Sequence, residues 1–150
     1  MMNNLKLTRG YMNNNPCNII INPQLTFRNE IIPSKDKTFK QFTDIVWGYR
    51  AAIWLVKYYI LEDNLNTIEK IINHCAPQTK NNTIQYIKNM EIFTGISRKT
   101  IIEPNNKDYI ILIIKGISEQ ENGLIPDINK IKQAYTLLWN HYLKEFSHVF

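Results

Sequence analysis

The chain has 150 residues, of which 44% are apolar and 11% are aromatic, and its formal net charge is +5. This length and this apolar content suffice for a single domain, 1–150, with a buried core, and they exclude a wholly disordered chain. The 18 Lys and Arg residues are spread along the chain. The positive charge therefore suits nucleic acid, an anionic wall polymer or simple solubility equally well.

Several common features are missing from the sequence. No apolar run approaches the roughly 20 residues that a membrane-spanning helix needs. Residues 1–8 lack the apolar middle region of a secretory signal. The two cysteines, Cys17 and Cys75, are too few for a disulfide framework, and the three histidines lack metal-ligand spacing. We therefore expect no membrane span, no signal peptide, no metal and no cofactor.

The first part of the chain combines turn signals with two short strand patterns. Residues 1–24 are expected to be irregular, with a turn signal at 13–16. Residues 25–28 and 38–42 are typical of strands, and the loop between them contains Pro33. The sequence therefore predicts a small β-hairpin.

From Asp44 onward, apolar residues recur every three or four positions, which is typical of helices. Asp44 is suited to cap the first helix, which is apolar on most sides and is therefore expected in the core. Gly95 and Gly123 are typical residues after a helix C-terminus. Helices are predicted from 44 to about 59 and over 67–74, 82–93, 107–120 and 127–146. The predicted fold class is mainly α, with about five helices and a small β-hairpin.

Three segments of the sequence, in a fixed order, resemble a known family. The first segment, 9–19, is Arg-Gly-Tyr-Met-Asn-Asn-Asn-Pro-Cys-Asn-Ile. The second segment contains Phe39, Phe42, the run 48–52 and Tyr58. The third segment contains Thr67-Ile68, Ile71-Ile72, Ala76-Pro77, Asn81 to Thr83, Tyr86-Ile87 and Gly95. Over residues 9 to about 96 the chain resembles the phage and prophage family called structural protein P5, whose members are treated as lysozyme-like virion proteins. A shorter similarity, Glu121-Asn122-Gly123, follows late in the chain.

The resemblance implies a lysozyme-like α+β domain that binds bacterial peptidoglycan, either with or without the ability to hydrolyse it. It also implies a location in the virion, or in the host cytoplasm before lysis. One alternative is a non-catalytic virion or tail structural protein of the same fold, with other virion proteins as partners. A third interpretation, a basic protein associated with nucleic acid, predicts a steep salt dependence of DNA binding, and we expect no such partner.

The chain departs from the family pattern at three positions. Cys17 replaces a Gly, Cys75 replaces the Trp that precedes Ala-Pro, and Lys80 stands where an acidic residue is common. The first two changes remove a close backbone approach and an aromatic ring that could stack on sugar, which argues against intact activity. Because both cysteines fall inside matched motifs, we also predict that Cys17 and Cys75 lie near each other.

Two carboxylates are the predicted catalytic acids. Glycan cleavage needs a carboxylic acid that is held protonated, often with a second carboxylate about 5–9 Å away. Glu30 and Asp36 lie on the predicted hairpin, although they could equally be solvated loop acids near Arg28 and Lys35. In similar wall enzymes the main acid comes from a helix that precedes the Asn-Asn segment. Here residues 1–8 contain no carboxylate, which argues against an active enzyme.

The predicted substrate-binding residues are polar side chains from the first segment and one arginine from the first helix. The asparagines could bind N-acetyl groups or could simply satisfy the backbone of a turn. The arginine lies in a largely apolar helix, so it either ties the helix to the asparagine segment or points to solvent. We expect residues 9–19 to fold back on the hairpin and on this helix, which would form a concave polar surface for a sugar chain. These residues are Asn13, Asn14, Asn15, Asn18 and Arg50.

Overall fold

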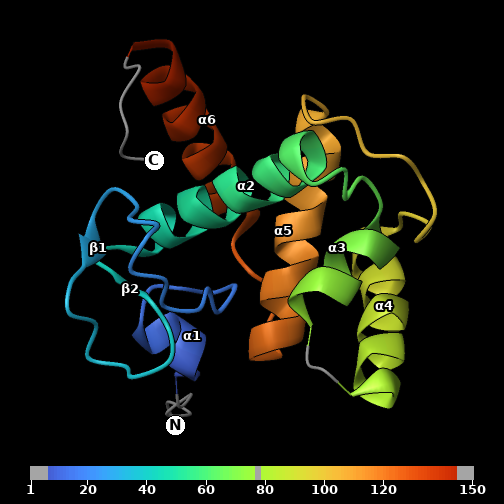
Figure 1. Ribbon diagram of the computed structural model, residues 1–150, viewed down its shortest axis with the longest axis horizontal. Coiled ribbons are helices and arrows are strands. Elements are labelled where there is room, and N and C mark those ends of the chain that lie inside the picture. The colour runs from blue at the N-terminus through green and yellow to red at the C-terminus, as the bar shows by residue number, and fades with distance from the viewer. Residues whose placement is uncertain (1–6, 77–78, 145–150) are drawn as a thin grey trace, which may run out of the picture.

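The structure, a computed structural model, describes residues 7–76 and 79–144 (Figure 1). In this part of the chain there are six helices and a two-stranded antiparallel sheet. The mainly helical fold with a small hairpin is therefore confirmed. The elements are α1 (Arg9–Met12), β1 (Glu30–Ile31), β2 (Gln41–Phe42), α2 (Ile45–Glu62), α3 (Ile68–Cys75), α4 (Lys80–Thr94), α5 (Lys107–Asn122) and α6 (Ile128–Lys144).

Helices α2 and α5 cross at the centre of the molecule, and the other elements pack around them (Figure 1). Helix α6 packs mainly on α2, whereas α4 packs on α5 and also contacts α3. The sheet contacts the start of α2, and α1 contacts α5. The N-terminal segment and the end of α5 are therefore neighbours, although they are far apart in the sequence.

The helix ends follow from local capping chemistry. The Asp44 carboxylate accepts a hydrogen bond from the Val46 amide at 2.9 Å, so the predicted cap of α2 is confirmed. Gly95 and Gly123 follow α4 and α5 in the left-handed conformation, with φ of 71° and 68°. The five predicted helices are all present, with ends shifted by a few residues. The last two residues of the predicted helix over 127–146 lie outside the described residues.

The predictions for the first part of the chain need two corrections. Residues 9–12 form a helical turn rather than irregular chain, because the Thr8 hydroxyl caps it by accepting from the Tyr11 amide. Residues 25–28 are not a strand. The chain turns at Asn29, which has a φ of 56°, and the strand that pairs with Gln41–Phe42 begins only at Glu30.

Two clusters of buried apolar side chains hold the elements together. The larger one joins α2 to α6, and its fully buried members include Ile53, Ile68, Ile110 and Ile113. Burial of each such side chain stabilises the fold by about 1.5–3 kcal/mol. The smaller cluster, built on Phe27, Phe42 and Ala51, fastens the hairpin to α2.

Candidate functional site

The loop that follows α1, residues 13–19, folds back on the hairpin and on α2; we call it the Asn loop. The Phe42 amide donates to the Asn13 carbonyl at 2.9 Å, and Asn14 Nδ2 donates to the Phe42 carbonyl at 3.1 Å. The loop also lies directly on α2, since a Cβ added at Gly48 would be 1.9 Å from the Asn14 carbonyl oxygen. The docking that the sequence predicted for residues 9–19 is thus present in the structure.

Most of the asparagines in this loop serve the loop itself. Asn14 and Asn18 both have a φ of 51°, a conformation that Asn tolerates better than most residues. Asn15 is fully buried, and its Nδ2 donates to the carbonyls of Ile19 and Lys40 at 3.0 and 2.8 Å. These contacts favour the turn interpretation for Asn13, Asn14 and Asn15, and their proposed sugar contacts stay predictions.

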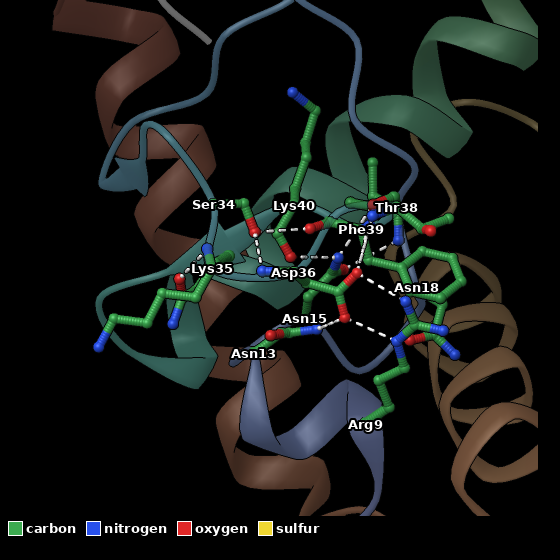
Figure 2. A network of polar contacts seen from close by, with 12 residues as sticks. Arg9, Asn13, Asn15, Asn18, Ser34, Lys35, Asp36, Thr38, Phe39 and Lys40 are labelled. Carbon is green, nitrogen blue, oxygen red and sulfur yellow. Dashed lines mark hydrogen bonds and ion pairs between the residues drawn. The ribbon is translucent and has the colours of Figure 1, made fainter.

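Asp36 is the centre of the polar network drawn in Figure 2. Its carboxylate accepts from Arg9 Nε and Nη2 at 2.6 and 2.7 Å, from Asn13 Nδ2 at 3.0 Å, and from the amides of Thr38 and Phe39. The hydrogen bond from Arg9 and those from the two amides hold the pKa of Asp36 well below its ordinary value of 3.8. A carboxylate in this setting favours the ionised form. Its contacts favour a structural role over that of a proton donor.

Glu30 is likewise engaged in an ion pair. Lys40 Nζ lies 2.9 Å from both of its carboxylate oxygens, and the Phe27 amide donates to Glu30 Oε1. The Glu30 side chain is 6% exposed and pairs with Lys40, so it is not a solvated loop acid. Both predicted catalytic acids therefore hold the hairpin, and a catalytic role for either one stays a prediction.

Arg50 lies in the buried part of α2. It is 2% exposed, which overturns the alternative that it points to solvent. Its guanidinium lies over the Trp47 ring, 5.6 Å from the ring centroid. Burial lowers its pKa to about 10, with a smaller contribution from the charge of Arg28. Arg50 does not line the cavity described next, and its predicted contact with sugar stays untested.

A cavity of about 310 Å³ opens between the segment that begins with the Asn loop and helices α2, α3, α4 and α5. Aliphatic side chains of α2, α3 and α5 form much of its wall. We call it the Glu121 cavity, because the carboxylate of Glu121 lies in its lining. Its polar lining includes Asn18, Tyr59, His74, Cys75, Tyr86 and Glu121.

The Glu121 carboxylate is held by two hydrogen bonds at the rim of this cavity. Asn18 Nδ2 donates to Oε2 at 3.2 Å, and the Tyr86 hydroxyl donates to Oε1 at 3.3 Å. Surrounding protein atoms raise the pKa of Glu121 above its ordinary value of 4.5, because they displace water from the charged form. The two hydrogen bonds act in the opposite direction. The side chain stays exposed on one side, where a ligand could reach it.

The residue after Glu121 fastens the end of α5 to the Asn loop. Asn122 Nδ2 donates to the Pro16 carbonyl at 2.7 Å, and Asn122 Oδ1 accepts from the Thr8 hydroxyl at 2.5 Å. Gly123 then ends the helix. This clamp places Glu121 opposite Asn18, 103 residues away in the sequence.

Sequence reasoning missed Glu121 as a site residue. It sought a helix-borne acid upstream of the Asn loop, whereas the structure supplies one from α5, downstream of the loop. The sequence feature that could have pointed to Glu121 was the short family similarity over Glu121-Asn122-Gly123.

Both cysteines line the Glu121 cavity, and both thiols are free. Burial raises the pKa of Cys75 to about 11. Burial also raises the pKa of Cys17, with smaller contributions from the charge of Glu121 and then from Cys75. Two cysteines that lie far apart in the sequence thus share one cavity. A separation within bonding range stays a prediction.

Comparison with known proteins decides the family. No family model matches the chain. The chain is similar to "Protein P5" of Pseudoalteromonas phage PM2, with 31% identity over 137 residues that cover 89% of this chain and 82% of that protein. The chain belongs to the phage protein P5 family. For this member of the P5 family, no helix within 7–76 and 79–144 has the length and apolar character needed to cross a membrane.

Asp36 allows a test of how the stability of this P5-family chain depends on pH. Because its pKa in the folded chain lies below 3.8, its stabilising contribution is present above that pH and is lost as the pH falls through the lowered value. We expect Asp36→Asn to lower the free energy of unfolding at neutral pH. The gap to the wild type should close on acidification, as measured by urea denaturation at a series of pH values. Glu103→Gln, a change at an exposed position, should give a gap that is small at every pH.

Proposed function

We propose that this chain binds the glycan of bacterial peptidoglycan in the Glu121 cavity and cleaves it there. The single observation that carries the proposal is the Glu121 carboxylate, held by Asn18 and Tyr86 at the rim of a cavity whose walls raise its pKa. Carboxylic acids with a raised pKa in a cavity are the usual proton donors to a departing glycosidic oxygen. Glu121 would take this role in place of Glu30 and Asp36.

The lining of the cavity suits an N-acetylated sugar. Such a sugar offers hydroxyl groups and an amide on its edge and an apolar acetyl methyl group. The Glu121 cavity offers polar groups from Asn18, Tyr86 and Tyr59 beside aliphatic walls such as Leu55 and Ile117. Membership of a phage family and the resemblance to lysozyme-like proteins support the same substrate class.

The proposal is tested by replacing the acid and measuring wall clearing. We expect purified protein to reduce the turbidity of a wall suspension and Glu121→Gln to lower the rate by about 10²–10⁴-fold, because Gln cannot donate the proton. Glu119→Gln is the matched control, since Glu119 lies on the same helix, pairs with Lys115 at 3.0 Å and does not line the cavity. Equal clearing by the wild type and Glu121→Gln would count against the proposal, as would loss of clearing in a stably folded Glu30→Gln.

Folding of the Glu121→Gln variant is checked in the same experiment. A carboxyl whose pKa is raised in the folded state contributes stability at low pH and loses it as the pH rises above 4.5. Gln carries no charge at any pH. We therefore expect Glu121→Gln to be at least as stable as the wild type at neutral pH, so that lost clearing reports chemistry rather than unfolding.

A second candidate function is that of a non-catalytic virion or tail component. The two thiols in the cavity favour it, because Cys17 and Cys75 stand where the resemblance places Gly and Trp. This candidate requires that the chain neither clears purified wall nor sediments with it, and that it remains bound to purified phage particles.

A further inference from the structure

The two cysteines of the chain come from different elements and line the same cavity. Cys17 belongs to the Asn loop, and Cys75 is the last residue of α3. Both thiols are free, and the sequence contains no third cysteine. Within one chain each thiol therefore has a single possible disulfide partner.

Shared neighbours place the two thiols close to each other. Burial is the main cause of the raised pKa of Tyr86, and the charges of Glu121 and of both cysteines add to it. The charge of Glu121 also contributes, after burial, to the raised pKa of each cysteine. Interactions between charges weaken with distance. The two thiols therefore lie near the same carboxyl and the same phenol, within one cavity lining.

The two thiols differ in how a reagent reaches them. Cys75 is exposed, and a hydrogen bond with Tyr59 lowers the pKa of its thiol in opposition to the larger effect of burial. Cys17 is half-buried, and its Sγ lies 4.0 Å from the Ile114 carbonyl oxygen. A reagent in solution therefore meets Cys75 first, and Cys17 is placed to act as the second thiol.

We propose that Cys17 and Cys75 are a site of reversible oxidation, at which a small disulfide such as oxidised glutathione joins them and closes the Glu121 cavity. Cys75 loses its proton and attacks one sulfur of oxidised glutathione, which forms a mixed disulfide and releases one glutathione. Cys17 then loses its proton and attacks the Cys75 sulfur, which forms the Cys17–Cys75 bond and releases the second glutathione. The two protons end on the two released thiols. Two electrons pass from the cysteine pair to the glutathione disulfide.

The bond ties the Asn loop to the end of α3. The loop is already fixed on its other side, because Asn122 Nδ2 donates to the Pro16 carbonyl at 2.7 Å, so the end of α3 is the part that adjusts. The next residue after Cys17 is Asn18, which holds Glu121, so the bridge forms beside the carboxyl at the rim. Cytosolic reductants keep such thiols reduced, and they oxidise outside a cell. The cavity is therefore open under reducing conditions and closed under oxidising ones.

The experiment is incubation of the reduced full chain with oxidised glutathione in a mildly alkaline buffer, followed by mass spectrometry without a reducing agent. We expect a monomer that is lighter than the reduced chain by two hydrogen atoms, and one cross-linked peptide pair that contains Cys17 and Cys75. Cys17→Ser should keep glutathione on Cys75, because no second thiol removes it, whereas Cys75→Ser should react far more slowly. A wild-type chain that keeps glutathione on Cys75, or that forms only linked dimers, would overturn the proposal whatever the variants do.

Thermal unfolding and wall sedimentation measure what the bond does. The oxidised chain should unfold at a higher temperature than the reduced chain, because the cross-link restricts the unfolded state, and a thiol reductant should reverse the shift. A lower unfolding temperature after oxidation would show that the bond does not fit the folded chain. We expect less sedimentation with wall for the oxidised chain, and equal sedimentation of both forms would contradict closure of the cavity. Failure of the reduced chain to sediment would count against the function proposed above and leave the disulfide assignment intact.

Discussion

Replacing Lys40 by Met is expected to lower the free energy of unfolding by about 3–5 kcal/mol. Lys40 is 1% exposed, and its ammonium group neutralises the buried carboxylate of Glu30 and donates to the carbonyls of Asn22 and Leu25. Met fills a similar volume but leaves a buried negative charge without a partner. Chemical denaturation followed by circular dichroism at neutral pH measures the loss.

Two further variants show whether the buried charge is the cause. Lys37→Met removes an exposed lysine of the same loop and should change the free energy of unfolding by no more than about 0.5 kcal/mol. Adding Glu30→Gln to Lys40→Met removes the unpaired charge and should restore part of the lost stability. Equal effects of Lys37→Met and Lys40→Met would contradict this account of the pair.

Gly48→Ala is expected to destabilise the chain by about 1–3 kcal/mol and to weaken wall binding. A Cβ at this position would meet the Asn14 carbonyl oxygen at 1.9 Å, and a backbone atom cannot move aside alone. The whole Asn loop would have to shift, which would displace Asn18 from Glu121. Thermal unfolding and a wall sedimentation assay measure the two effects.

Gly116→Ala is the matched control for Gly48→Ala. Gly116 is also buried within a helix, but its added Cβ would meet side-chain atoms rather than backbone, at 2.9 Å from Thr94 Cγ2 and 3.0 Å from the thioether end of Met90. The Met90 end can shift, whereas Thr94 is held by a hydrogen bond from its hydroxyl to the Met90 carbonyl at 2.7 Å. Because Ala also favours a helix by about 1 kcal/mol over Gly, we expect Gly116→Ala to cost less stability than Gly48→Ala. A smaller loss for Gly48→Ala than for Gly116→Ala would show that the loop does not rest on α2 as described.

The helices could be predicted from the sequence because their signals are local. Asp44 caps α2, Gly95 and Gly123 end α4 and α5, and the apolar spacing between these points has the period of a helix. The strand at 25–28 was wrong because such a short strand depends on its partner. Residues 38–40 pair partly with Ile19 to Ile21 rather than with residues 25–28.

For the candidate site, the turn signal at 13–16 identified the Asn loop, and the resemblance to lysozyme-like proteins implied its docking on the hairpin and α2. It did not identify the carboxyl that faces the loop. Glu30 and Asp36 were predicted as catalytic acids because they lie on the hairpin, but they form ion pairs with Lys40 and Arg9. Which charges meet depends on side chains that only the folded chain brings together.

The sequence by itself determined the helical class, the helix caps and the turn at 13–16, since each follows from forces that act within a few residues. The tertiary structure alone decided that Glu121 faces Asn18, that Asn122 clamps α5 to the loop, and that Cys17 and Cys75 share a cavity. These pairings arise from the packing of α5 against the N-terminal segment. This packing fixes neighbours that lie about a hundred residues apart and displaces part of the water around Glu121.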